Sequence, residues 1–226
     1  MSRETLSAFQ KDGAVVIRSF FDDTTISELT TALKEYERDT VPRLPGVFYS
    51  READSEAMRG LFWMNIFSPY FSDILADRRM LEVIERLTGW TPRPMFVEAF
   101  MKPAWRGGSI PLHQDVAYSA VDPPQQATIW VPIDRVRKTN GAVRYFLGSH
   151  KAGLKPHRAS GIRGSSLEAE NTETYPEAVF ELNPGDVIVH DGLVLHDSPA
   201  NETAQARRAI AFGYRGVSTT FADLVI

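Results

Sequence analysis

The stretch PLHQDVAYSA, residues 111–120, holds a histidine and an aspartate that could act together in chemistry. The run reads as a β-strand. Side chains alternate between the two faces of a strand, so His113 and Asp115 are expected to point the same way. An imidazole and a carboxylate on one face form either an ordinary hydrogen-bonded pair or two thirds of a metal site. The second possibility requires a third ligand from elsewhere in the chain.

Two histidines further along, His190 and His196, could supply that ligand. Two imidazoles and one carboxylate on one face form the facial triad of non-haem Fe(II) oxygenases, which leaves other coordination positions open. Such an iron also holds an oxidisable cosubstrate, and a 2-oxoacid dicarboxylate needs a cation for its far carboxylate. Arg207, eleven residues after His196, could provide a forked guanidinium, and Ser198 could add a hydroxyl.

The first ninety residues are expected to form a mostly helical preface to these motifs. Ser2 is a suitable N-cap, and Thr25 with Glu28 has the spacing of a capping box, which predicts a helix start there. A later helix is expected to stop at Gly89. Between the first two helices, AVVIRSF reads as a short strand.

The character of the sequence changes after this preface, because about eight strand-like segments follow, separated by Pro, Gly, Asn and Asp. This pattern predicts a mainly β, α+β fold with a double-stranded β-helix core, of the jelly-roll or cupin-like kind, and N-terminal helices packed outside. We interpret residues 1–226 as one domain, with the helical preface in 1–90 and the jelly roll in 91–226. Residues 40–60 and 151–177 read as polar loops, and long loops often act as lids.

Composition excludes several classes of protein. The net charge of −4 and the lack of a long basic run argue against a nucleic-acid partner. No apolar run approaches the roughly 20 residues that span a bilayer, and the polar start is unlike a secretory signal. The absence of cysteine excludes disulfides, thiolate zinc sites and cysteine nucleophiles. We therefore expect a cytoplasmic protein that acts on a small molecule, and the sequence does not fix its oligomeric state.

Longer motifs add a resemblance to a known family. The segments FQKDGAVVIRSFF, MKPAWRGGSIPLHQD, ATIWVPIDRVRKTNGAVRYFLGSHKAG and GDVIVHDGLVLHDSPANETAQARRAI follow one another along the chain. In this order and spacing they resemble the phytanoyl-CoA dioxygenase family of Fe(II)/2-oxoglutarate oxygenases, over most of the chain. The sequence departs from the family at Leu147 and Pro132, which concern turns and packing more than chemistry.

The resemblance implies a role for each candidate residue. It implies that the iron ligands are His113, Asp115 and His196, with His196 preferred to His190 because only His196 has the family's spacing to the serine and arginine. It also implies that the far carboxylate of 2-oxoglutarate is bound by Arg207 and Ser198, and that Trp130 lines the same pocket. The residues expected to be catalytic are the three ligands and Arg207.

The implied reaction uses Fe(II), 2-oxoglutarate and O2, releases succinate and CO2, and hydroxylates a small to medium hydrophobic metabolite, such as an intermediate of secondary metabolism. Cyclisation, desaturation or epimerisation by the same chemistry remains open, whereas halogenation is disfavoured because Asp115 is present. Two alternatives of another class also remain, a cupin-like metal-dependent isomerase and a non-catalytic 2-oxoglutarate-binding protein.

Two features near these motifs have less obvious roles. The aromatic segment LFWMNIFSPYF, residues 61–71, could wall a substrate pocket, but we expect it to pack a helix onto the sheet. Glu98, in the strand before Lys102, could reach the cavity, but we expect it to point outward into solvent.

Overall fold

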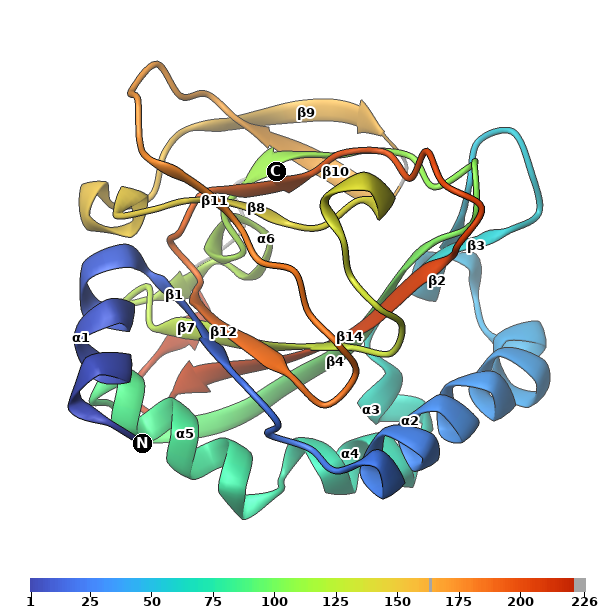
Figure 1. Ribbon diagram of the computed structural model, residues 1–226, viewed down its shortest axis with the longest axis horizontal. Coiled ribbons are helices and arrows are strands. Elements are labelled where there is room, and N and C mark those ends of the chain that lie inside the picture. The colour runs from blue at the N-terminus through green and yellow to red at the C-terminus, as the bar shows by residue number, and fades with distance from the viewer. Residues whose placement is uncertain (163, 222–226) are drawn as a thin grey trace.

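A sheet of seven strands forms the centre of the computed structural model, which describes residues 1–162 and 164–221 (Figure 1). Its strand order is β1-β12-β7-β14-β4-β3-β2, and each neighbouring pair is antiparallel. In chain order the strands are β1 (Ala14–Ile17), β2 (Tyr49–Arg51), β3 (Met58–Leu61), β4 (Pro92–Lys102), β7 (Gln126–Pro132), β12 (Val187–Asp191) and β14 (Arg207–Gly216).

A second sheet has the order β11-β8-β13-β5 and packs against the first. Its strands are β5 (Ile110–His113), β8 (Arg144–Phe146), β11 (Glu177–Val179) and β13 (His196–Ser198). One buried cluster joins the two sheets, with Trp130 and Ala211 from the larger sheet and Tyr145 from the smaller. Two packed antiparallel sheets confirm the predicted jelly-roll core.

Helices cover the opposite face of the seven-stranded sheet (Figure 1). They are α1 (Arg3–Asp12), α2 (Asp23–Glu35), α3 (Met64–Phe67), α4 (Pro69–Leu75) and α5 (Arg78–Thr88), with short turns of other helix types at Tyr36–Thr40, Val41–Arg43 and Gly46–Phe48. Leu29 and Ile84 from these helices share a buried cluster with Phe212 of the sheet. Within the described part of the chain, no helix has the length and apolar character needed to cross a membrane.

The helix ends agree with the sequence at some positions and differ at others. Ser2 caps α1 as predicted, since its side chain accepts the Thr5 N–H, and α5 ends at Gly89, whose φ of 78° suits glycine. The predicted capping box at Thr25 is wrong, because α2 begins earlier. Asp22 is its N-cap, and a carboxylate oxygen of Asp22 accepts the Thr25 N–H at 2.8 Å.

The two segments predicted as loops contain regular structure. Within 151–177, β9 (His157–Ile162) and β10 (Ser165–Ala169) form an antiparallel hairpin, and β10 packs against β5. This hairpin lies on the side of the molecule opposite the helices (Figure 1). Its polar composition concealed it, because neither face of the hairpin carries an apolar stripe. Residues 40–60 contain helical turns, the start of β3, and β2, which forms one edge of the larger sheet next to β3.

Candidate metal site and its pocket

The predicted strand through residues 111–120 ends early, which changes how its two polar residues meet. His113 is the last residue of β5, whereas Asp115 lies beyond the strand as the N-cap of α6 (Val116–Ser119), with helical φ and ψ of −60° and −36°. The expectation that both residues share one strand face is therefore wrong. The turn still brings them together, and Asp115 Oδ1 lies 3.6 Å from His113 Nε2.

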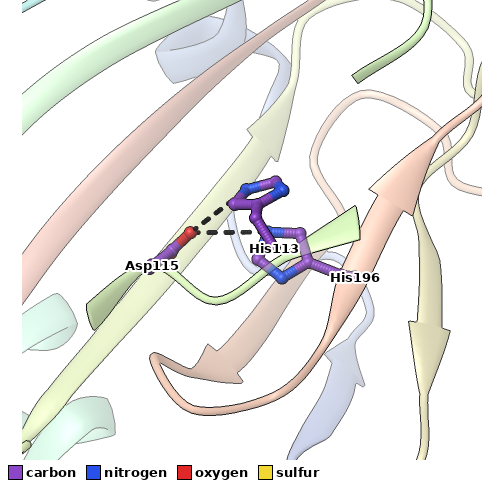
Figure 2. Close-up of side chains that lie close together, drawn as sticks. All are labelled: His113, Asp115 and His196. Carbon is purple, nitrogen blue, oxygen red and sulfur yellow. Dashed lines mark ion pairs between the residues drawn. The ribbon is translucent and has the colours of Figure 1, made fainter. Parts of the chain in front are cut away.

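His196 completes the group from the neighbouring strand. It pairs directly with His113 in the register of β13 and β5, and its Nε2 lies 3.4 Å from Asp115 Oδ1. Figure 2 shows both imidazoles directed at the carboxylate from adjacent backbone segments. One ligand atom from each of the three residues lies within 4.8 Å of the others, so together they could hold a metal ion. The structure thus brings together the three residues that the sequence singled out.

Backbone carbonyls fix which imidazole nitrogen is free to bind. His113 Nδ1 lies 2.8 Å from the Pro111 carbonyl, and His196 Nδ1 lies 3.0 Å from the Val194 carbonyl. A carbonyl only accepts, so each Nδ1 carries the proton and each Nε2 presents a lone pair. Both lone pairs lie on the side of Asp115 Oδ1, as coordination of one ion requires.

The other carboxylate oxygen of Asp115 is held by residues of the larger sheet. Thr128 Oγ1 donates to Oδ2 at 2.8 Å, and His190 Nε2 lies 3.0 Å from the same oxygen. The Tyr145 hydroxyl lies 3.1 Å from His190 Nδ1 and donates to it when Nε2 carries the proton. His190, the rival ligand in the sequence, therefore contacts the oxygen that faces away from the two imidazoles.

The protonation states of the three candidate ligands favour a metal at this site. Burial and the neighbouring His113 lower the pKa of His196 to about 3, and burial likewise lowers the pKa of His113. Burial acts to raise the pKa of Asp115, but His196 and His190 outweigh it and the pKa lies well below its usual range. At neutral pH the site therefore offers two neutral imidazoles and one carboxylate, a donor set that suits Fe(II).

Arg207 lies in the same cavity with unused hydrogen-bonding capacity. Its side chain is 1% exposed, and Nη2 donates to the Gly141 carbonyl at 2.8 Å and to Ser198 Oγ at 3.2 Å. Its Nε and Nη1 are buried and have no partner among the described residues. Burial lowers the pKa of Arg207 to about 10, so the group stays cationic at neutral pH. Unpaired guanidinium N–H groups are costly unless an anion binds them, and a carboxylate has the matching fork.

The predicted neighbours of Arg207 also lie here. Trp130 lines the cavity, and its ring centroid lies 5.4 Å from the Arg207 guanidinium carbon. The indole ring therefore packs against one side of the guanidinium. Gly141 has φ of 84°, and a β-carbon there would overlap the Lys102 side chain. The Asn-Gly turn therefore requires glycine to bring its carbonyl to Arg207 and Ser198.

The cavity beside the three candidate ligands opens into a wider pocket. The inner cavity is about 70 Å³ and the outer pocket about 540 Å³, and both are lined by Phe96, Glu98, Phe100, Ile110, His113 and Asp115. The expectation that Glu98 points outward is wrong. Strand alternation could have shown this, because Glu98 shares a face with Phe96 and Phe100 while Val97 and Ala99 pack under the helices.

The aromatic segment 61–71 divides between two roles. Phe71 is fully buried in the helix-facing core, as expected. Phe62 and Trp63, however, line the outer pocket, so the expectation that the segment only packs a helix is wrong at its start. Trp63 has a left-handed φ of 56° and precedes α3, and this turn separates the two environments.

Comparison with known proteins places the chain in a family. The phytanoyl-CoA dioxygenase family profile matches residues 9–209. A phytanoyl-CoA dioxygenase domain-containing protein 1 homolog of Caenorhabditis elegans is 22% identical over 250 residues, which cover 89% of this chain and 86% of the relative.

Solved structures share the fold. EctD from S. alaskensis, crystallised with bound Fe, aligns with a TM-score of 0.83 at 22% identity, covering 98% of this chain and 79% of EctD. The epimerase SnoN, in complex with Fe3+, alpha-ketoglutarate and nogalamycin RO, aligns with a TM-score of 0.82 at 16% identity. The alignment covers 99% of this chain and 86% of SnoN. The chain belongs to the phytanoyl-CoA dioxygenase family, the Fe(II)- and 2-oxoglutarate-dependent oxygenases that its sequence motifs resemble.

Proposed function

We propose that this chain oxidises a C–H bond of a small-molecule substrate at an iron held by His113, Asp115 and His196. In this proposal Arg207 and Ser198 bind the far carboxylate of 2-oxoglutarate, and Trp130 closes that end of the cavity. When bound, Fe(II) with 2-oxoglutarate supplies the oxidising power, using O2 and releasing succinate and CO2. The substrate we favour is a small to medium hydrophobic metabolite, since the shared walls of the two cavities are largely aromatic and aliphatic.

The observation that carries the proposal is the unpaired guanidinium of Arg207 in the cavity of the three candidate ligands. A metal-binding isomerase needs the two imidazoles and the carboxylate, but it has no use for a buried cation with two unpaired guanidinium nitrogens. A dicarboxylate that reaches from the metal to Arg207 would pair those groups and offset the cost of burying them. This arrangement therefore favours an oxygenase over the cupin-like alternative.

The residues of the chain have three tasks in this reaction. His113 and His196 present fixed Nε2 lone pairs because their Nδ1 protons are held by carbonyls. Thr128 and His190 hold Asp115 Oδ2, so that Oδ1 is left for the metal and coordination positions stay open. The apolar walls limit water near the reacting carbon, which protects a reactive species from side reactions. Whether the oxidised substrate is hydroxylated, cyclised, desaturated or epimerised depends on how it lies in the outer pocket.

An anaerobic titration of the Fe(II)-loaded protein with 2-oxoglutarate tests this proposal. Chelation of Fe(II) by a 2-oxoacid produces a weak visible charge-transfer band. We expect the band in the wild type, and we expect Arg207→Ala to weaken the apparent affinity for 2-oxoglutarate at least about tenfold, as loss of a charged hydrogen-bonding partner does.

Arg208→Ala is the matched control, because Arg208 is the next residue of β14 and pairs with Asp134 at 2.8 Å, away from the cavity. Its titration should follow the wild type. A wild type that binds Fe(II) but develops no band with 2-oxoglutarate would refute the oxygenase proposal and favour the metal-dependent isomerase.

A further inference from the structure

Glu98 is a carboxylate that the chemistry at the metal does not use. It lies on β4 and lines both the inner cavity and the outer pocket, so it stands where the two meet. The residues two places before and after it, Phe96 and Phe100, project from the same strand face into the same space. A substrate that enters the outer pocket and approaches the metal must pass this carboxylate.

The carboxylate of Glu98 has no hydrogen bond and no ion pair with any of the residues 1–162 and 164–221. Its surroundings are instead aromatic, with Phe96 and Phe100 beside it on the strand and Trp63 packed edge-on against Phe96 at 6.1 Å between ring centroids. Burial, and then the nearby charge of Asp115, raise the pKa of Glu98 to about 8. A carboxylate in this setting lacks a partner, and a ligand can supply one.

We propose that Glu98 binds the ammonium group of the substrate, so that the enzyme oxidises an amine with an apolar body. The proposal deepens the proposed function and rests on it, since it names the substrate class of the same pocket. The ammonium pairs with the carboxylate, and the apolar body lies against the aromatic walls of the outer pocket.

The chemistry of the pocket selects a cation over other groups. An anionic substrate would gain no attraction from Glu98 and would keep that carboxyl protonated. A neutral alcohol could donate one hydrogen bond to Glu98, but it would not favour the ionised form of a carboxyl whose pKa is raised to about 8, whereas a bound ammonium does. An ammonium compensates the charge, and the faces of the neighbouring aromatic rings attract it as well.

The position of Glu98 also bears on which carbon reacts. Glu98 and the three candidate ligands line the same small inner cavity, so an amine held at Glu98 has its adjacent carbons beside the metal. Oxidation is therefore directed to a carbon close to the nitrogen, while the distal part of the substrate extends toward Trp63 and Phe62.

Isothermal titration calorimetry with matched probes tests this proposal. The probes are phenethylamine, hexylamine, phenethyl alcohol and hydrocinnamate, which share an apolar body and differ in the charge of the head group. They are titrated into anaerobic protein loaded with Fe(II) and 2-oxoglutarate. We expect the amines to bind wild type at least about tenfold more tightly than the alcohol or the acid, and we expect Glu98→Gln to abolish this preference.

Glu35→Gln removes a carboxylate from the exposed surface of α2 and should leave the preference intact. Glu98→Arg should reverse the preference toward hydrocinnamate, and this gain cannot arise from a damaged fold. Equal binding of all probes to wild type, no detectable binding of any amine, or an amine preference that survives in Glu98→Gln would each overturn the proposal. The charge-transfer band is recorded in the same samples, so a failure of the iron and cosubstrate assignment is seen separately.

Discussion

The two carboxylate oxygens of Asp115 have different partners, and residues from the larger sheet hold one of them. Thr128 and His190 approach Oδ2, while Oδ1 faces the imidazoles of His113 and His196. A carboxylate held in this way coordinates through one oxygen and does not rotate to chelate with both. In the proposed site, the coordination positions for oxidant and cosubstrate would thus be kept open by residues that are not candidate ligands.

Lys102 is a second buried charge near Arg207 with an unusual environment. It is 2% exposed, and its Nζ donates to the carbonyls of Gly108 and Ser198. Burial, followed by the neighbouring Arg207 and Arg59, lowers the pKa of Lys102 to about 6. At neutral pH the folded protein therefore holds a mostly neutral amine, whereas the unfolded chain carries an ammonium.

This difference predicts a pH dependence of stability. Between about pH 6 and pH 10 the unfolded state binds one more proton at Lys102 than the folded state does, so stability rises with pH. Lys102→Met should remove a contribution of about 1.4 kcal/mol per pH unit from that slope. Urea unfolding at pH 7.0, 7.5, 8.0 and 8.5 measures it.

The comparison needs a control for the loss of a lysine as such. Lys151→Met removes an exposed lysine and should keep the wild-type slope. The raised pKa of Glu98 contributes a slope of opposite sign, but it is common to all three proteins and cancels in the differences. Parallel slopes for wild type and Lys102→Met would show that Lys102 is charged in the folded protein.

At the scale of elements, the hairpin β9–β10 forms one wall of the outer pocket and is tied to α6. The Tyr118 hydroxyl donates to the Leu167 carbonyl at 3.3 Å and accepts the Leu167 N–H at 3.1 Å. His157 Nε2 in turn accepts the N–H of Gln114, which lies between the two ligand candidates of that segment. The sequence left open whether residues 151–177 form a lid. If the hairpin is one, these contacts would hold it closed over the pocket.

Tyr118→Phe tests whether the β9–β10 hairpin closes the outer pocket. Removal of the hydroxyl breaks both hydrogen bonds to β10 while keeping the ring against His113, so the hairpin should open more often. Water then reaches the cavity, and we expect 2-oxoglutarate turnover in the absence of substrate to rise about two- to tenfold, in line with the loss of two weak hydrogen bonds. Succinate release measures this uncoupled turnover.

Tyr175→Phe removes a hydroxyl that bonds the nearby Glu173 and lies outside the pocket lining, and it provides the matched control. Uncoupled turnover equal in Tyr118→Phe and wild type would mean that the hairpin does not gate the pocket, whatever its contribution to the pocket wall.

The elements also show what the sequence could predict. Strands with alternating or fully apolar residues, such as β4 and β7, were identified, because burial of one or both faces leaves a pattern of period two or a continuous apolar run. The candidate site residues were proposed from the spacing of rare residue types together with the resemblance to a known family. Tyr145 and Thr128 could not be found in that way, because their role depends on which strands become neighbours. The early end of β5 was missed because the turn into α6 is set by long-range contacts such as the Val116 N–H bonded to the Gly192 carbonyl.

At the scale of the whole molecule, the seven-stranded sheet separates two buried hydrophobic clusters, and only one of them borders the candidate site. The larger cluster lies between the sheet and the helices and contains Leu29, which is fully buried. The smaller cluster lies between the two sheets and contains Leu182, also fully buried, with Trp130 and Tyr145 next to the site. The first cluster contains more of the buried apolar residues, whereas residues of the second line the cavity.

This division predicts that stability and site geometry can be changed separately. Leu29→Ala and Leu182→Ala delete the same atoms from fully buried positions, and each should lower the free energy of unfolding by about 2–5 kcal/mol in urea. Only Leu182→Ala should also weaken 2-oxoglutarate binding in the charge-transfer titration, because its cavity forms in the layer that supports Trp130 and Tyr145. Leu29→Ala, although less stable, should titrate like wild type, since the sheet lies between the deletion and Arg207. An equal loss of cosubstrate affinity in both variants would mean that the sheet transmits the strain and that the two clusters act as one core.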